Sequence, residues 1–180
     1  MFKKYWKFFV IFWSVVLVGI IGVFVFFWLI SAGKLGFMPT FEELENPNNR
    51  FASEVYFADG PIMNRYFEKE NRKYIEYREI PQSVIDALIA TEDVRFYDHS
   101  GVDVRGLFRV AKGLLTANTS AGGGSTISQQ LAKMLFPRES DLNVFELAIR
   151  KFREWVIAVR LEKSYTKEEI LTMYLNKYDF

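Results

Sequence analysis

The chain has 180 residues, of which 50% are hydrophobic and 17% aromatic, and it contains no cysteine and carries a formal net charge of +1. The absence of cysteine excludes a disulfide framework and a zinc–thiolate site. A charge this close to neutral gives no global field for nucleic acid, so we expect no nucleic-acid partner, and any anion site must be a local patch. The length suits one domain with a short additional segment.

The segment Phe8–Ile30 contains no charged side chain. As a helix it would be roughly 35 Å long, slightly more than the hydrocarbon core of a bilayer. A cleaved signal peptide is the alternative, since Ser31-Ala32-Gly33 are small, but the run exceeds the usual apolar core of about 7–15 residues and no A-x-A site follows. We therefore expect an uncleaved transmembrane helix. Residues 1–7 form a lysine-rich tail, which predicts a cytoplasmic N-terminus.

Residues 31–50 have the glycine, proline and asparagine content of a linker, and we expect one domain over residues 51–180. Early in that domain, Glu54–Ala58 and Ile62–Phe67 flank a turn at Asp59-Gly60-Pro61, a pattern that predicts a small β element.

The remainder of the chain predicts helices. One begins near Pro81 and ends at Glu92, a second covers Val104–Leu115, and Thr116–Gly124 is a glycine-rich loop. Three more helix starts show a capping pattern, with an acceptor three residues ahead of a glutamate or glutamine: Thr126 with Gln129, Asn143 with Glu146, and Thr166 with Glu169. The fold class is therefore mainly α.

The first candidate site is Glu92-Asp93-Val94-Arg95-Phe96-Tyr97-Asp98-His99-Ser100-Gly101. A carboxylate at the end of an apolar helix is a candidate general base. Two adjacent acids alone are more often a solvated pair at a helix end. For His99 we favour a structural role, because no nucleophile or metal partner accompanies it.

Two further motifs suggest an anion site. Gly124-Ser125-Thr126-Ile127-Ser128-Gln129-Gln130-Leu131-Ala132-Lys133 places a helix N-terminus after glycines. We expect its free backbone N–H groups to be available to an anion, with Lys133 adding a positive charge. Arg150 and Glu154 lie four residues apart on one helix face, where an ordinary salt bridge is the alternative interpretation. A fourth motif, Lys167–Asn176, looks structural, and we assign it no chemistry. We reject Ser164 with Lys167 as an acyl-enzyme site, because four residues with two fixed positions occur often by chance.

The chain resembles the peptidoglycan glycosyltransferase domain (glycosyltransferase family 51) of class A penicillin-binding proteins, because it carries, in this order, Glu-Asp-x-x-Phe-x-x-His-x-Gly, Gly-x-Ser-Thr-x-x-Gln-Gln-x-x-Lys and Arg-Lys-x-x-Glu. The resemblance implies a lysozyme-like, mainly α domain after one transmembrane helix. It also implies polymerisation of lipid II into glycan strands with release of undecaprenyl diphosphate. The family's pattern continues beyond the Tyr-Leu-Asn element, so we expect this domain to be incomplete at its C-terminus, with a penicillin-binding transpeptidase domain in the parent protein.

The resemblance also assigns roles. Glu92 is the general base, and Glu154 is the second catalytic glutamate, a candidate ligand of a divalent cation (Mg²⁺ or Mn²⁺); no organic cofactor is expected. The structural residues are Phe96, His99 and Gly101. The expected substrate-binding residues are Asp93, Ser125, Thr126, Gln129, Gln130, Lys133, Arg150 and Lys151.

The implied setting is a single-pass protein of the bacterial inner membrane with its catalytic domain on the periplasmic side. Its partners would be lipid II, the growing glycan strand, the membrane and other cell wall synthesis proteins. Arg105, Arg109 and Lys112 lie on a helix that could meet anionic headgroups. Two alternatives remain: a lysozyme-like lytic hydrolase, which would shorten glycan, and a non-catalytic membrane-anchored module that binds lipid II or glycan.

Overall fold

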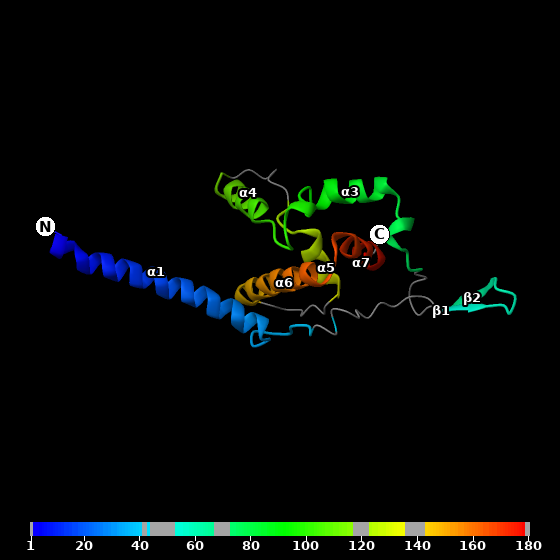
Figure 1. Cartoon of the computed structure of the whole chain (residues 1–180), viewed down its shortest axis with the longest axis horizontal. Coiled ribbons are helices and arrows are strands. Elements are labelled where there is room, and N and C mark those ends of the chain that lie inside the picture. Colours follow the sequence, from blue (N-terminus) through cyan, green and yellow to red (C-terminus); the bar gives the residue numbers. More distant parts are fainter. Residues whose placement is uncertain are drawn as a thin grey trace. The chain divides into compact units, whose positions relative to one another are not determined.

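The computed structural model describes residues 2–40, 43, 53–66, 73–116, 123–135 and 143–178. The predicted mainly α class is confirmed (Figure 1). The elements are α1 (Phe2–Ser31), β1 (Ser53–Tyr56), β2 (Ile62–Tyr66), the 3-10 turn η1 (Tyr77–Glu79), α3 (Gln82–Glu92), the 3-10 turn η2 (Phe96–Asp98), α4 (Val104–Leu115), α5 (Ile127–Leu135), α6 (Val144–Ser164) and α7 (Lys167–Lys177).

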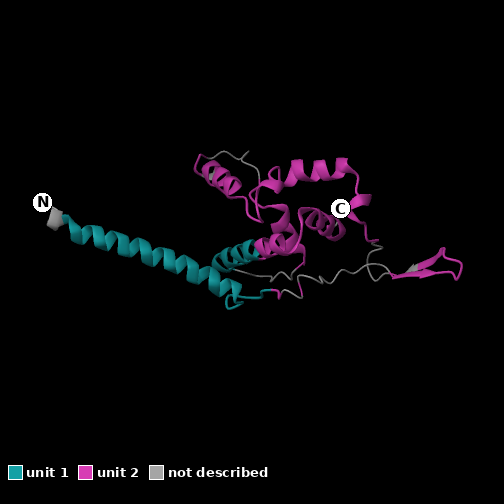
Figure 2. Cartoon of the chain, in the orientation of Figure 1, with its two compact units in different colours: residues 1–38, 142–156 teal, residues 39–141, 157–180 magenta. Residues whose placement is uncertain are grey.

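The chain divides into two compact units (Figure 2). The first comprises residues 1–38 and 142–156, and the second comprises residues 39–141 and 157–180. The division falls within α6, so that residues up to 156 belong to the first unit with α1, and residues from 157 onward belong to the second unit.

The N-terminal helix is long and apolar enough to cross a membrane. The segment Tyr5–Ser31 has a mean hydropathy of 2.8, and its most apolar stretch is not buried by the rest of the protein. Near its C-terminal end the helix meets the first half of α6, where the rings of Phe26 and Phe27 lie 5.3 and 5.7 Å from the ring of Phe152. Length and composition therefore fit a single anchor, and the first unit is held together by aromatic contacts.

A glycine allows the chain to turn after this helix. Gly36 has φ +115°, and a Cβ there would lie 2.2 Å from a guanidinium nitrogen of Arg153. The side chain of Arg153 is only 9% exposed, so it fills the space that a larger residue at position 36 would need. The turn and the arginine are thus matched to one another.

The predicted β element is confirmed as an antiparallel hairpin with slightly shorter strands. Ser53 pairs with Tyr66, and the register shifts between Val55 and Tyr56. The first strand ends early because Phe57 belongs to the turn, in which its N–H donates to the carbonyl of Pro61 at 2.9 Å. Phe67 lies outside the described residues.

The core of the second unit is built around α5, which packs against α7 (Figure 1). Because α5 is buried on several sides, two of its polar side chains, Ser128 and Gln129, are fully buried and must find internal partners. The apolar core residues of this unit are Ile80, Ile85, Phe96, Ile127, Leu131, Ala132, Ile157, Ala158, Leu161, Ile170, Leu171 and Tyr174.

Two of the three predicted capping boxes form as expected. Asn143 exchanges hydrogen bonds with Glu146 at 2.8 and 3.0 Å, and Thr166 forms a capping box with Glu169. At the start of α5 only half of the box exists, because the Thr126 hydroxyl accepts from the N–H of Gln129 at 3.2 Å but the Gln129 side chain does not return to Thr126. Its amide instead donates to the carbonyl of Gly101, since tertiary packing supplies a buried acceptor there.

Candidate active site

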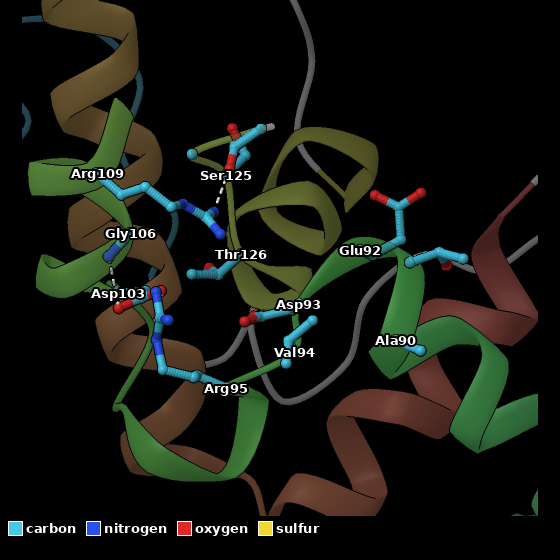
Figure 3. A pocket seen from close by; sticks show the side chains of 13 residues that line it. Ala90, Glu92, Asp93, Val94, Arg95, Asp103, Gly106, Arg109, Ser125 and Thr126 are labelled. Carbon is cyan, nitrogen blue, oxygen red and sulfur yellow. Dashed lines mark hydrogen bonds and ion pairs between the residues drawn. The ribbon is translucent and has the colours of Figure 1, made fainter. Parts of the chain in front are cut away.

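A cavity of about 230 Å³ lies where three helices of the second unit meet. It is bounded by the end of α3, by α4 and by the glycine-rich approach to α5 (Figure 3). Its charged lining residues are Glu92, Asp93, Arg95, Asp103 and Arg109. The first motif and the start of the second motif therefore line one space, although they are separated along the chain.

Glu92 and Asp93 are adjacent in sequence but face different surroundings. Asp93 follows α3 with φ −157° and ψ 76°, which turns the backbone and separates the two side chains (Figure 3). Glu92 is exposed, whereas Asp93 is 7% exposed. Only the first carboxylate is open to a solvent-borne substrate, and this difference suits it to accept a proton.

The Glu92 carboxylate is held by a neighbouring helix. The side-chain amide of Gln130, on α5, donates to Oε2 of Glu92 at 2.6 Å. The hydroxyl of Tyr174, on α7, donates to Oε1 of the same glutamine at 3.0 Å. Within the described residues, three helices thus contribute to the placement of this carboxylate.

Asp93 joins the first motif to the second. Its Oδ2 lies 3.0 Å from Nε2 of His99 and accepts from the backbone N–H of Ile127 at 3.1 Å. The other ring nitrogen, Nδ1, accepts from the N–H of Gly101 at 3.2 Å, so the neutral imidazole carries its proton on Nε2 and donates it to Asp93. The carboxylate and the imidazole are nearly buried, with side-chain exposures of 4% and 7%.

The turn that contains His99 is also held by a lysine from the fourth motif. Nζ of Lys167 donates to the carbonyl of His99 at 2.7 Å and lies 4.2 Å from the centre of the fully buried Phe96 ring. The same ammonium is paired with Glu162 at 2.7 Å, and Glu162 also accepts from the hydroxyl of Ser128. Lys167 of the fourth motif therefore contacts the turn of the first motif directly, and it is linked to Ser128 of the second motif through Glu162.

The second motif divides into inward and outward side chains. The hydroxyl of Thr126 donates to the carbonyl of Gly101 at 2.7 Å, and the amide of Gln129 donates to the same oxygen at 3.2 Å. These two side chains are 2% and 0% exposed, whereas Ser125, Gln130 and Lys133 are half-buried.

The structure corrects the expectation that the start of α5 offers unused backbone N–H groups to an anion. The N–H of Ile127 is taken by Asp93, and that of Gln129 by the hydroxyl of Thr126. Internal acceptors therefore occupy two of the first three amides of the helix. A phosphate near this point would have to be met chiefly by side chains.

Sequence reasoning missed one ion pair of the cavity wall. Asp103 binds Arg95 at 2.5 Å and accepts from the N–H of Gly106 at 2.9 Å, which caps α4. Burial alone would raise the pKa of Asp103, but the hydrogen bonds from Arg95 and Gly106 and the arginine charge outweigh it, so that the pKa is lowered. An aspartate directly before an amphipathic segment was the available signal.

Arg150, Lys151 and Glu154 lie in the first unit, on α6. Nζ of Lys151 donates to Glu154 at 3.1 Å, an i,i+3 pair in which the carboxylate is only 12% exposed. Among the residues that the structure describes, no three carboxylate or histidine side chains gather into a ligand set for a metal. A cation there would need ligands from a substrate as well as from Glu154, an arrangement that is usual for Mg²⁺ bound with phosphates.

Sequence comparison with known proteins identifies relatives of this chain. The family model described as Transglycosylase matches residues 59–180. Penicillin-binding protein 1A of Escherichia coli is 39% identical over 140 residues, which cover 78% of this chain and 16% of that protein. The proteins of the same name from Haemophilus influenzae and Vibrio cholerae are 39% and 33% identical over 149 and 162 residues, covering 83% and 90% of this chain.

The chain belongs to the transglycosylase family. The resemblance inferred from the motifs is thereby confirmed. The chain spans only 16–18% of the length of these relatives.

Proposed function

We propose that this chain carries the glycan-polymerising site of a peptidoglycan glycosyltransferase that acts in cell wall synthesis. Family membership supports the reaction class. The observation that carries the proposal is the position of Glu92, whose exposed carboxylate lies at a cavity and is held by Gln130 at 2.6 Å. An oriented carboxylate open to substrate is what deprotonation of a sugar hydroxyl requires.

In the proposed reaction the 4-hydroxyl of an acceptor lipid II gives its proton to Glu92 as its oxygen attacks the anomeric carbon of the growing chain. The bond from that carbon to the diphosphate breaks, the configuration inverts, and undecaprenyl diphosphate leaves with the bonding electrons. Cationic side chains stabilise the charge that develops on the leaving group. We assign this role to Lys133, Arg150 and Lys151, and we add Arg109, whose guanidinium lines the cavity and donates to the carbonyl of Gly123 at 3.2 Å.

We further propose that a divalent cation, Mg²⁺ or Mn²⁺, would be held jointly by Glu154 and the diphosphate. When bound, it would neutralise charge on the leaving group. The ammonium of Lys151 and the carboxylate of Glu154 lie 3.1 Å apart, so that the lysine is available to bind a phosphate and the glutamate to bind a metal ion.

The proposed setting is a membrane with both lipid substrates in it. α1 would serve as a single-pass anchor, with the lysines that precede its apolar segment in the cytoplasm and the domain on the other side. α4 supports a lipid-facing role, because Phe108 and Leu115 are 73% and 89% exposed and Arg105 and Lys112 accompany them.

The test is polymerisation of labelled lipid II in detergent with Mg²⁺, on a gel that resolves glycan length. We expect a ladder that Glu92→Gln reduces by a factor of about 10² or more. The control Asp86→Asn removes another exposed acid from the same helix and should keep the ladder. An undiminished ladder in Glu92→Gln would refute the role of this residue.

The other outcomes distinguish the alternatives. Shortened glycan from sacculi with no consumption of lipid II would indicate a lytic hydrolase. Binding of lipid II without turnover, both by this chain and by a longer chain that contains it, would indicate a non-catalytic module.

A further inference from the structure

Three side chains from three helices are joined by hydrogen bonds that lead from the core to the surface. Tyr174 on α7 is 1% exposed, Gln130 on α5 is half-buried, and Glu92 at the end of α3 is exposed. The hydroxyl of Tyr174 donates to Gln130 Oε1 at 3.0 Å, and Gln130 Nε2 donates to Glu92 Oε2 at 2.6 Å. The fourth motif, to which the sequence assigned no chemistry, thus reaches the candidate base through one intermediary.

The direction of this chain of hydrogen bonds follows from the chemistry of its inner end. Burial, and then the charge of Glu92, raise the pKa of Tyr174 to about 12, so that the phenol keeps its proton at neutral pH. A glutamine side chain can turn either its oxygen or its NH₂ group toward a neighbour. With the oxygen of Gln130 engaged by the hydroxyl, the NH₂ group faces the carboxylate; without the hydroxyl, the amide oxygen loses the donor that fixes it, and the glutamine side chain is held only by its bond to Glu92.

The ring and the hydroxyl of Tyr174 do different things. The ring is part of the core and stacks on the ring of Tyr178 at 5.3 Å with an interplanar angle of 21°. The hydroxyl makes the bond to Gln130. Replacement by phenylalanine therefore preserves the packing and removes only the contact with the glutamine.

We propose that Tyr174 is a positioning residue for the glycosyl transfer, which acts through Gln130 to hold one carboxylate oxygen of Glu92 and leaves the other for the acceptor hydroxyl. The inference rests on the proposed role of Glu92 as the base. A hydrogen bond to one oxygen restricts rotation of the carboxylate, and restricted geometry is what an attacking group needs at close range.

The orientation can be measured without turnover, because the chain contains only three glutamines: Gln82, Gln129 and Gln130. Labelling the full chain with ¹⁵N-glutamine gives three side-chain amide signal pairs in a micelle. Their acceptors differ: Asp86 for Gln82, the carbonyl of Gly101 for Gln129, and Glu92 for Gln130. The pair that moves in Glu92→Ala, which keeps the number of glutamines at three, identifies Gln130, since its charge-assisted bond is lost.

We expect Tyr174→Phe to move that same pair in the same direction although Glu92 is intact, and to leave the Gln82 and Gln129 signals in place. Tyr178→Phe, which removes the hydroxyl of the stacked neighbour, is the matched control and should leave the Gln130 signals unchanged. If the Gln130 signals in Tyr174→Phe coincide with those of the unaltered chain, or if no pair moves in Glu92→Ala, the proposal is wrong.

Measuring kcat and KM of Tyr174→Phe distinguishes a positioning role of the hydroxyl from a role in packing alone. The measurement is run in whichever chain gives a glycan ladder, this one or a longer one that contains it. Loss of one hydrogen bond should lower kcat by about fivefold to tenfold while KM stays within about twofold. A kcat within twofold of the unaltered protein, beside an inactive Glu92→Gln variant, would overturn the positioning role. An active Glu92→Gln variant would refute the proposed base, and the amide signals would still show whether Tyr174 orients Gln130.

Discussion

The carboxylate of Asp93 accepts a hydrogen bond from the backbone N–H of Ile127, a residue 34 positions further along the chain, at 3.1 Å. The same oxygen lies 3.0 Å from the imidazole of His99. One carboxylate therefore fixes the turn of the first motif and the first turn of α5 at once. Because Gln130 is on α5, the hydrogen bonds of Asp93 also help to position the side chain that binds Glu92.

Removal of the Asp93 carboxylate should destabilise the domain. Asp93→Ala would leave the imidazole N–H and the N–H of Ile127 buried without an acceptor, which we expect to cost about 3 kcal/mol at about 1–3 kcal/mol for each unsatisfied donor. Asp93→Asn retains one acceptor oxygen and should cost less. Chemical denaturation followed by circular dichroism measures both, with exposed Asp98→Ala as the control. Equal stability of Asp93→Ala and Asp98→Ala would contradict this account.

Gly101 should not tolerate a side chain. Its φ is +94°, and a Cβ would lie 2.7 Å from the backbone carbonyl carbon of Ala158. Gly101→Ala therefore combines a strained backbone, which costs about 1–2 kcal/mol, with a clash against a helix that cannot move freely.

The matched control for that substitution is Gly60→Ala. Gly60 has a similar φ of +104° but no atom within 4 Å of the position that its Cβ would take. We expect the midpoint of thermal unfolding to fall by several degrees more in Gly101→Ala than in Gly60→Ala. Equal midpoints would show that crowding against Ala158 is unimportant.

Lys167 should contribute more stability than an ordinary surface lysine. Lys167→Met would leave the carboxylate of Glu162, which is 4% exposed, without its cation. Because the lysine is partly exposed, we expect a loss of about 3 kcal/mol, at the low end for a broken buried pair. Exposed Lys163→Met is the control. Adding Glu162→Gln to Lys167→Met should restore part of the loss, and a double variant no better than the single one would argue against a charge effect.

Asp103 predicts a specific dependence of stability on pH. Its pKa in the folded protein is lowered from 3.8, since the Arg95 and Gly106 interactions outweigh the effect of burial. The folded state therefore prefers the ionised form, and this contribution is present above about pH 4 and is lost as the pH falls through the lower folded value.

Asp103→Asn should thus be less stable than the unaltered chain at pH 6, and the gap should narrow below about pH 4. Unfolding midpoints measured from pH 6 to pH 2.5 in the same detergent give this difference directly. A gap that stays constant across the range would mean that the carboxylate charge of Asp103 contributes nothing to stability.

Much of the fold could be predicted from local sequence. The apolar run from Phe8 to Ile30 indicated a membrane-spanning helix, and the structure has one helix from Phe2 to Ser31 that contains it. Turn residues located the hairpin, and capping patterns located the starts of α6 and α7. These features depend on residues within a few positions of one another, so the sequence carries them without tertiary information.

The candidate site could be predicted only in part. Motif order pointed to Glu92 and to the start of α5, and these line or adjoin one cavity. The capping interpretation failed for Gln129, whose amide donates to the carbonyl of Gly101, because a buried polar group takes whatever acceptor packing brings near it.

By itself, therefore, the sequence determined the family, the helical class and the presence of an apolar N-terminal helix, since these depend on motif identity, periodicity and composition. Only the tertiary structure decided that Glu92 is exposed whereas the adjacent Asp93 is buried and hydrogen-bonded. It also decided that Tyr174 reaches Glu92 through Gln130. The physical reason is that hydrogen bonds between residues 34 to 44 positions apart depend on how helices pack, and no local pattern encodes that packing.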